Sequence, residues 1–482
     1  MTDTPYAGMR ILVLGLGIEG VALTRFFAAR GARVTVSDTR TREQLAARRA
    51  ELGGVPFTLV CGPHHPALAA DADALYLSQS RSPDLPLAEA ARARGLPVGT
   101  ITTLLYEICR GRLVAITGSS GKTTTTSLVA AIFKESGLPF LLAGNIGTWP
   151  LDELERIPPD TWVVLELSHT QLQLTTRSPR VACVTNVTPN HLDEFSWEAY
   201  QDLKRNLIRH QRPGDLAVLN WDNALTRAFR RETAAETLYF SMQGDVPADG
   251  VFLRDERIVW RRNGQDEAVL AAAEIPLRGR HNVENVLAAT AIAGACAVPM
   301  AAVARAVRGF TGVPHRLEVV GTVGGVTYVN DSIATAPERT LAGMAAFPEP
   351  IVLLLGGRDK HLSLAGLAAE AVHRCRAVIT FGEAGALFAA ELRAAWSTGG
   401  PALEQVAALP EAVARAAAVA QPGDAVLLAP AGTSFDAYPN FERRGEHFRM
   451  LVTSLSPQQT FLSTRHAACS TETAPPRTGV PL

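Results

Sequence analysis

The segment Leu113–Phe133, LVAITGSSGKTTTTSLVAAIF, decides the fold. A short apolar run of strand character leads into a loop from Gly118 to Gly121, and Lys122 and Thr123 open a helix. Backbone N–H groups of such a loop can surround phosphate, the lysine amine can meet β- and γ-phosphate oxygens, and the threonine hydroxyl can bind Mg²⁺. A helix-capping turn would explain the glycines but not a lysine followed by four threonines. The segment therefore predicts an α/β nucleotide-binding domain.

The same alternation of apolar runs and Ala-rich stretches extends in both directions from this segment. Nine runs have strand length, namely ILVLG, VTVSD, LVAIT, WVVLELS, VACVTNV, LAVLN, IVLLLGG, AVITFG and AVLLAPA. Buried strands joined by crossover helices are typical of parallel α/β sheets, which bind ligands at the carboxyl ends of their strands. Gly- and Pro-containing connectors predict domains over 1–100, 101–312 and 313–455, and the Ser-, Thr- and Pro-rich residues 456–482 predict a disordered tail.

Composition excludes several classes of function. The 482 residues include 46 Lys and Arg and 47 Asp and Glu, so the net charge of −1 gives no general attraction for nucleic acid or an anionic membrane. The six scattered cysteines and the absence of an apolar leader predict reduced thiols and a cytoplasmic protein. The uncharged stretch Asn285–Ala304 is rich in Ala and suits a buried helix better than a membrane span. We expect a monomer with no nucleic-acid partner and no membrane insertion.

A second glycine motif lies near the amino terminus. In Ile11–Arg40, Gly15, Gly17 and Gly20 have GxGxxG spacing after a strand, and Asp38 ends the next strand. In dinucleotide enzymes these glycines allow close approach of a pyrophosphate, and the acid binds the ribose hydroxyls. Because the chain has a separate phosphate loop, a nucleotide ligand other than NAD is an equal candidate. Glycines that only tighten a turn remain the structural alternative.

Three central residues could serve a metal or the phosphates. Glu166 ends an apolar strand, where a carboxylate can hold Mg²⁺ or can bond only to backbone donors. His191 follows another strand in NVTPNHLDEF, but histidine is a poor Mg²⁺ ligand and is usually structural. Lys204 lies beside the apolar face of a helix in SWEAYQDLKRNLIRH, and a solvated surface lysine is its usual interpretation.

The later motifs add amides and cations. Asn282 and Asn285 lie three apart on one helix face and could hold a base edge, or could be caps or core amides. Arg316 of PHRLE and Lys360 of LLLGGRDKHL could converge on a transferring phosphate, with Asp331 of VNDSIATAPE holding one of them in place. Each of these charges alone could be a surface residue or a helix cap.

The order of these motifs resembles the Mur ligases of peptidoglycan synthesis. ITGSSGKTTTT, LELS, NHLD, RHNVENVLAA, PHR, NDSIATAPE, LGGRDK and SFDAYPNFERRGEHF occur in that order, and the resemblance spans residues 8–455. The GLGIEG unit is most similar to the D-glutamate-adding members. The resemblance implies three α/β domains: a Rossmann-like domain for a UDP-linked substrate, a central P-loop ATPase, and a dinucleotide-fold-like domain that brings the amino acid. It implies ATP-dependent joining of D-glutamate to UDP-N-acetylmuramoyl-L-alanine through an acyl phosphate.

The resemblance also implies roles for the residues at matching positions. ATP would contact Gly118, Gly121, Lys122, Thr123, Asn282, Asn285, Arg316 and Asp331. Two Mg²⁺ ions would use Thr123, Glu166, His191 and a carbamylated Lys204. The catalytic residues would be Lys122, His191, Lys204 and Lys360. The UDP-linked substrate would contact Ile18, Glu19, Asp38, Thr39, Arg40 and Asn145, and glutamate would contact Thr335, Ser434 and Phe435. A carbamate makes the lysine a carboxylate-like ligand of the kind that Mg²⁺ prefers.

The chain departs from the family pattern in three places. Ile333 stands where the family usually has a lysine associated with glutamate, so L-glutamate or another amino acid is the alternative substrate. His169 and Thr170 replace Ser and Phe, and Leu77–Pro83, LSQSRSP, replaces a Ser-Pro-Gly turn. Two other interpretations remain open. A folylpolyglutamate synthase-like ligase would not need the amino-terminal domain, and a nucleotide-binding redox or sensor protein would not need the carboxyl-terminal motifs.

Overall fold

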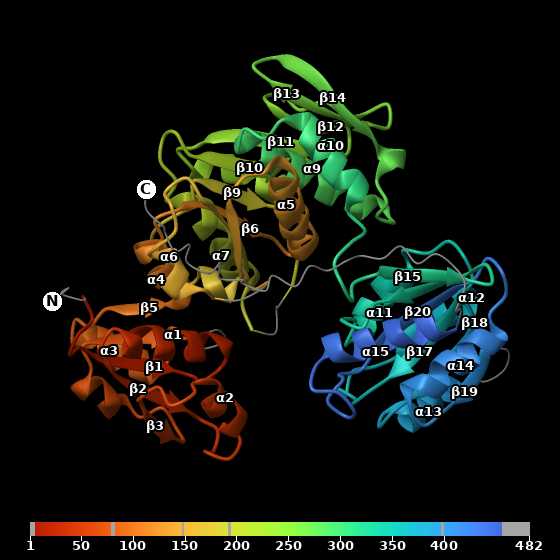
Figure 1. Ribbon diagram of the computed structural model, residues 1–482, viewed down its shortest axis with the longest axis horizontal. Coiled ribbons are helices and arrows are strands. Elements are labelled where there is room, and N and C mark those ends of the chain that lie inside the picture. Colours follow the sequence, from red (N-terminus) through yellow and green to blue (C-terminus); the bar gives the residue numbers. More distant parts are fainter. Residues whose placement is uncertain (1–4, 79–81, 147–148, 191–193, 397–399, 456–482) are drawn as a thin grey trace, which may run out of the picture. The chain divides into compact units, whose positions relative to one another are not determined.

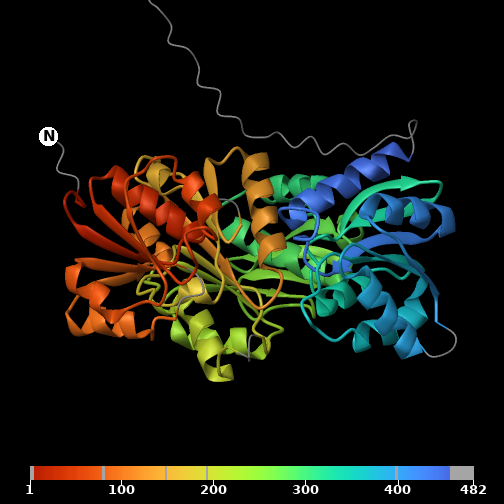
Figure 2. The same cartoon turned by 90° about the horizontal axis from the view of Figure 1, so that it is seen from below.

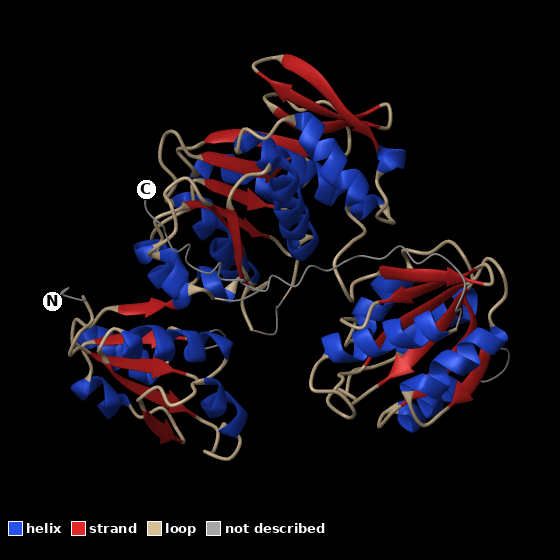
Figure 3. Ribbon diagram, in the orientation of Figure 1, coloured by secondary structure: helices blue, strands red, loops and turns tan. Residues whose placement is uncertain are grey.

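The computed structural model describes residues 5–78, 82–146, 149–190, 194–396 and 400–455, and the strands in these ranges form three β-sheets with helices packed on their faces (Figures 1 and 3). His191, within residues 191–193, and the tail 456–482 lie outside the described residues. The chain divides into two compact units, residues 1–310 and 311–482, and the first unit contains two of the three sheets. The predicted α/β class with mainly parallel sheets is confirmed.

The first sheet is wholly parallel and has the strand order β3-β2-β1-β4-β5. Its elements are β1 (Arg10–Leu14), α1 (Ile18–Ala29), β2 (Arg33–Asp38), α2 (Ala46–Glu51), β3 (Thr58–Cys61), β4 (Ala74–Leu77), α3 (Pro86–Ala93) and β5 (Val98–Thr100). Successive residues of β1 alternate between two buried clusters, with Ile11 and Val13 in one and Leu12 and Leu14 in the other. This alternation explains the unbroken apolar run, because both faces of a parallel sheet are covered.

The second sheet has nine strands in the order β14-β13-β12-β11-β10-β9-β6-β8-β7. Its strands are β6 (Arg112–Thr117), β7 (Phe140–Gly144), β8 (Trp162–Glu166), β9 (Val181–Val184), β10 (Leu216–Asn220), β11 (Glu236–Ser241), β12 (Gly250–Arg254), β13 (Arg257–Arg262) and β14 (Gln265–Ala271). Helix α4 (Ile101–Ile108) connects the first sheet to the second in the chain. The helices that follow are α5 (Lys122–Ser136), α6 (Leu151–Leu154), α7 (Trp197–Arg209), α8 (Ala224–Ala228), α9 (Arg280–Ala295) and α10 (Met300–Gly309). Strands β6 to β12 pair in parallel, and β13 and β14 add an antiparallel extension.

The third sheet has the order β15-β16-β20-β17-β18-β19, and only β15 is antiparallel to its neighbour. Its elements are β15 (Glu318–Val323), β16 (Val326–Asn330), α11 (Pro337–Met344), β17 (Ile351–Gly356), α12 (Ala365–Arg374), β18 (Cys375–Phe381), α13 (Gly385–Trp396), β19 (Ala402–Gln405), α14 (Leu409–Val419), β20 (Ala425–Ala431) and α15 (Phe441–Ser454). Figures 1 and 2 show helices on both faces of this sheet, and a separate buried cluster lies beneath each helical layer.

The nine predicted strands correspond to β1, β2, β6, β8, β9, β10, β17, β18 and β20, so all nine are confirmed. The uncharged stretch at residues 285–304 forms most of α9 and the first half of α10, and it is largely buried, as predicted. Among the described helices, none combines the length and apolar character that a membrane crossing requires.

Candidate active site

The predicted phosphate loop connects β6 to α5 in the central sheet. Gly118 has a φ of +154°, and a Cβ atom there would lie 1.9 Å from the hydroxyl oxygen of Thr185. Gly121 has a φ of +78°, and its Cβ would lie 2.4 Å from the side-chain oxygen of Asn285. Both glycines are therefore required by close approaches, one from the end of β9 and one from α9.

Lys122 folds back over this loop. Its Nζ donates to the carbonyl oxygen of Gly118 at 2.9 Å and to that of Ser119 at 3.3 Å. Because α5 begins at Lys122, the N–H groups of its first turn add positive potential at the same place. The loop thus concentrates a side-chain charge and a helix terminus, which is the arrangement that binds phosphate.

Lys204 on α7 is only 1% exposed. Its Nζ donates to the hydroxyl of Thr117, the last residue of β6, at 3.1 Å. Burial, followed by the charge of Lys122, lowers the pKa of Lys204 well below its ordinary value, while Glu166 opposes the shift. Because its side chain is buried, the interpretation of Lys204 as a solvated surface lysine is wrong.

Glu166 ends β8 and is 1% exposed. The side-chain amide of Asn145 donates to its Oε1 at 2.8 Å, whereas its Oε2 is buried and has no hydrogen-bond partner in the described residues. A buried carboxylate oxygen without a donor is costly unless a cation satisfies it. Nowhere in the described chain do three His, Cys, Asp or Glu side chains gather as a metal site. Carboxylate and hydroxyl oxygens such as those of Glu166 and Thr123 are the kind of ligand that Mg²⁺ prefers, and the magnesium site stays a prediction.

The predicted asparagine pair lies beside the phosphate loop. The amide of Asn285 donates to the Oδ1 of Asn282 at 3.0 Å, and that of Asn282 donates to the carbonyl of Arg278 at 2.7 Å. The Oδ1 of Asn285 accepts from the hydroxyl of Thr125 in α5 at 3.4 Å. The structure therefore brings this pair and the loop together, and the contact with ATP stays a prediction.

In the first sheet, the glycine motif closes tightly on itself, since a Cβ at Gly20 would lie 1.9 Å from the carbonyl oxygen of Gly15. Asp38 is wholly buried, and it accepts from the backbone N–H of Leu16 at 2.7 Å and from the guanidinium of Arg40 at 2.7 and 2.9 Å. Burial alone would raise the pKa of Asp38, but these donors outweigh it and hold the pKa below its ordinary value. Asp38 thus organises the loop and Arg40.

The other predicted substrate residues of this sheet differ in accessibility. Ile18, at the start of α1, is 62% exposed, and Thr39 is also exposed. Glu19 is buried, and its Oε1 accepts from the side-chain amide of Gln171 at 2.7 Å. Ile18 and Thr39 therefore lie open to a ligand, whereas Glu19 already has a protein partner.

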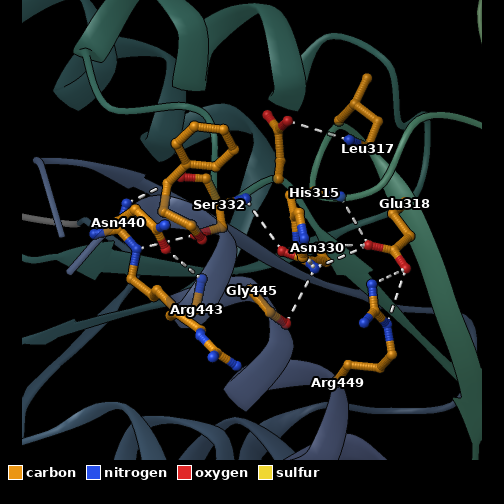
Figure 4. A network of polar contacts seen from close by, with 12 residues as sticks. His315, Leu317, Glu318, Asn330, Ser332, Asn440, Arg443, Gly445 and Arg449 are labelled. Atoms are coloured by element: carbon orange, nitrogen blue, oxygen red, sulfur yellow. Dashed lines mark hydrogen bonds and ion pairs between the residues drawn. The ribbon is translucent and has the colours of Figure 1, made fainter. Parts of the chain in front are cut away.

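In the second unit, Arg316 lies between two residues with left-handed backbone, His315 with a φ of +63° and Leu317 with a φ of +45°. The N–H of His315 donates to Glu318 at 2.8 Å, and the N–H of Leu317 donates to Asp331 at 3.1 Å. Figure 4 shows Asn330 amid this network, in contact with His315, Glu318 and Gly445. The network fixes the strained turn that contains Arg316. Sequence reasoning did not single out Asn330 or Glu318.

Asp331 is almost fully buried in this network. Burial raises its pKa to about 6, although the N–H of Leu317 and the charge of Arg316 oppose the shift. The folded-state pKa therefore lies above the ordinary value of 3.8, so stability from this carboxyl is present at low pH and is lost as the pH rises through 6.

We expect Asp331→Asn to stabilise the protein relative to wild type at neutral pH, because the amide keeps an acceptor for Leu317 and carries no buried charge. The advantage in unfolding free energy should grow by about 1 kcal/mol between pH 5 and pH 7. Denaturant unfolding of both proteins across this range measures it. A difference that is independent of pH would contradict the raised pKa.

Positive charge gathers near the predicted amino-acid residues. The Nζ of Lys360 donates to the hydroxyl of Thr335 at 3.0 Å, and partial burial together with Arg339 and Arg444 lowers the pKa of Lys360. Arg444 is wholly buried, and its guanidinium donates to Ser332 and to carbonyl oxygens of residues 332, 432 and 433. This combination suits an anionic ligand.

The remaining predicted residues follow β20. Ser434 is buried, while Phe435 is 61% exposed. Sequence reasoning missed Arg444, since nothing in FERRGEHF distinguishes it from the exposed Arg443 beside it. The signal becomes visible only when the helical face of α15 that meets the sheet is known.

Three family models match the chain. They are the Mur ligase MurD-like N-terminal domain over residues 9–100, the Mur ligase middle domain over residues 116–293, and the Mur ligase glutamate ligase domain over residues 315–432.

Curated relatives match almost the whole chain. The UDP-N-acetylmuramoylalanine--D-glutamate ligase of Symbiobacterium thermophilum is 42% identical over 93% of this chain and 98% of its own. The protein of the same name from Koribacter versatilis is 37% identical over 94% and 99%.

Solved structures share the fold at low identity. UDP-N-acetylmuramate-alanine ligase MurC from Thermotoga maritima has a TM-score of 0.56 at 20% identity, covering 93% of this chain and 100% of its own. Folylpolyglutamate synthase of Mycobacterium tuberculosis, complexed with ADP, has a TM-score of 0.52 at 15% identity, covering 72% and 93%.

Proposed function

The chain belongs to the Mur ligase family, and from this premise we propose that it joins D-glutamate to UDP-N-acetylmuramoyl-L-alanine at the expense of ATP, as a step of peptidoglycan synthesis. The observation that carries the proposal is the end-to-end match to relatives of that name at up to 42% identity. The match of residues 9–100 to a MurD-like domain favours this over a folylpolyglutamate synthase, with which the chain shares the fold.

The first chemical step is the activation of a carboxylate. The carboxylate oxygen of the UDP-linked substrate attacks the γ-phosphorus of ATP, the bond to the β-phosphate oxygen breaks, and ADP leaves with that electron pair. Negative charge builds on the transferring phosphoryl oxygens. Lys122 and the first turn of α5 stabilise that charge, because the Lys122 amine lies over the loop and α5 begins at its end.

The residues around Glu166 would hold magnesium in this step. The free Oε2 of Glu166, the Thr123 hydroxyl and a carbamylated Lys204 supply oxygen donors, and His191 is the predicted further ligand. Bound Mg²⁺ would neutralise phosphate charge and orient the phosphates. The carbamate would form when the neutral amine of Lys204 attacks the carbon of CO₂ and loses a proton.

The second step forms the amide. The amine of the amino acid attacks the acyl carbon, phosphate leaves, and the amine gives up a proton. We propose that Thr335 and the 434–435 loop hold the glutamate carboxylates. Lys360, whose Nζ donates to the Thr335 hydroxyl, offsets the charge on the transferring phosphate, and its cation-rich surroundings support an anion at this place. Arg316, Asp331, Asn282 and Asn285 would hold ATP. We further propose a cytoplasmic monomer.

Phosphate release with UDP-N-acetylmuramoyl-L-alanine and a panel of D- and L-amino acids tests the assignment. We expect D-glutamate to give the highest kcat/KM and to exceed neutral amino acids by at least about 100-fold, because a charged site left unpaired by a neutral amino acid loses several kcal/mol. Ile333 removes one candidate cation, so L-glutamate is the informative competitor. Preference for L-glutamate or a neutral amino acid would refute the D-glutamate assignment and leave the ligase assignment standing.

A further inference from the structure

The phosphate loop is held by a residue that none of the predicted roles includes. Asn186 follows β9, and its backbone carbonyl accepts the N–H of Ser119 at 2.9 Å. Its side-chain Oδ1 accepts the N–H of Ser120 at 2.9 Å and the hydroxyl of Ser120 at 3.2 Å, and its Nδ2 donates to the carbonyl of Ser120 at 3.4 Å. One asparagine therefore satisfies two consecutive amides of the loop.

The neighbouring Thr185 reinforces the same grip. Its N–H donates to the carbonyl of Thr117 at 2.9 Å, which continues the pairing of β9 with β6 into the loop. Its hydroxyl donates to the carbonyl of Ser120 at 2.6 Å and packs so closely that residue 118 must be glycine. The loop is thus an extension of the sheet and is held on one side by β9.

A third contact fixes the side chain of Ser119. Its hydroxyl donates to the carbonyl of Thr188 at 3.0 Å, accepts the N–H of Thr188 at 3.0 Å, and lies 3.1 Å from the phenolic oxygen of Tyr200 on α7. Tyr200 is one helical turn before Lys204, whose Nζ lies 5.3 Å from the Tyr200 ring centre. The segment after β9 therefore connects the loop to the helix that carries the buried lysine.

We propose that Asn186 is a positioning residue for ATP binding. Asn186 holds the phosphate loop in its binding shape before the nucleotide arrives, and it leaves the amino end of α5 free to receive the phosphates. The inference rests on the proposed ATP-dependent function and deepens it. Preorganisation of this kind raises affinity because the loop is already ordered when the ligand binds.

The opposite possibility is that Asn186 competes with phosphate for the two amides and must leave when ATP binds. The geometry favours positioning for two reasons. The amide of Ser119 bonds to a backbone carbonyl that belongs to the continuation of β9, so releasing it would break the sheet pairing at Thr185. The Asn186 side chain also bonds to Ser120 as both acceptor and donor, which locks the loop carbonyl as well as the loop amide.

The test compares Asn186→Ala with wild type by calorimetric titration of Mg-ATP. We expect the Kd for ATP to rise about tenfold, because two side-chain bonds to the loop backbone are lost at about 1 kcal/mol or less each. The KM for ATP should rise by a similar factor, while kcat at saturating ATP changes less than about threefold. Thr185→Val keeps the side-chain shape and removes the hydroxyl that donates to the carbonyl oxygens of Ser120 and Thr117, and it should give a smaller rise of about threefold.

Asn206→Ala is the matched control. Asn206 lies on α7 and donates to the carbonyl of Leu172 at 3.2 Å, and its hydrogen bonds within the described chain go to residues outside 118–121, so its variant should bind ATP as wild type does. Melting temperature and affinity for the UDP-linked substrate show whether each variant is folded. Unchanged or tighter ATP binding in folded Asn186→Ala would overturn the proposal, and tighter binding would identify Asn186 as a competitor. Because no amino acid is present in the titration, a wrong D-glutamate assignment does not affect this result.

Discussion

Lys122→Ala is expected to lose at least about 1,000-fold in ligation rate while the protein stays folded. Lys122 is only partly buried and its amine donates to carbonyl oxygens of its own loop, so we expect the Ala variant to keep the fold. What it removes is the side-chain charge beside the position where phosphoryl charge develops. Phosphate release at saturating ATP, UDP-linked substrate and D-glutamate measures the effect.

Lys134→Ala provides the control for Lys122→Ala. Lys134 is a lysine of the same helix, exposed in its last turn, and its removal should leave the rate unchanged. If Lys122→Ala kept near-normal turnover, the assignment of the loop to ATP chemistry would be wrong.

The second large effect is expected at Lys204. Lys204→Ala should lose most activity, because it removes the atom that would carry the carbamate, and added formate or acetate should restore part of it by supplying a carboxylate at the same place. Isotopically labelled bicarbonate should also label wild type in a carbon resonance that Lys204→Ala lacks.

Two controls separate this role from a packing role. Lys204→Met keeps the buried chain length beside Tyr200, so its stability should stay near that of wild type while its activity is lost. Full activity of Lys204→Ala would contradict the carbamate. A loss of activity that no carboxylic acid relieves would also contradict it, if wild type shows no labelled carbon.

Sequence patterns predicted the strands that are buried on both faces. The runs around β6, β17 and β20 are unbroken because helices cover both sides of each sheet, so an apolar run alone identifies them. The antiparallel extension was missed for the opposite reason. β14 begins with the exposed residues Gln265, Asp266 and Glu267, and its polar start resembles a loop. Short strands such as β3 and β7 also lack a long apolar run.

The sequence predicted those parts of the candidate site whose residues lie together in one short motif. Gly118, Gly121 and Lys122 belong to such a motif, and the structure shows the close approaches that require both glycines. The environment of Lys204 could not be predicted, since its helix pattern equally suits a surface lysine and only the packing of α7 on the sheet buries it. The contacts of Asn186 could not be predicted because its partners are backbone amides 66 and 67 residues earlier in the chain.

The hydrogen bonds of Asp38 could not be predicted from its motif. The pattern of an acid at the end of the second strand predicts a ribose ligand, and that role stays a prediction. In the structure, both carboxylate oxygens of Asp38 accept hydrogen bonds from the backbone N–H of Leu16 or the guanidinium of Arg40. Spacing alone does not reveal this, because the position of Arg40, two residues away, is set by the turn that follows β2.

The buried Arg444 has a consequence for how the second unit responds to its surroundings. Its guanidinium donates to carbonyl oxygens, and although burial lowers its pKa to about 10, the charge of Asp436 opposes the shift and the group stays charged at neutral pH. A moderate change in pH does not remove this charge, because the group does not titrate near neutral pH. Added salt screens it little, because water does not reach the buried guanidinium. The charge that Arg444 contributes at this end of the sheet is therefore constant near neutral pH, and changes in the catalytic rate with pH must originate in other groups.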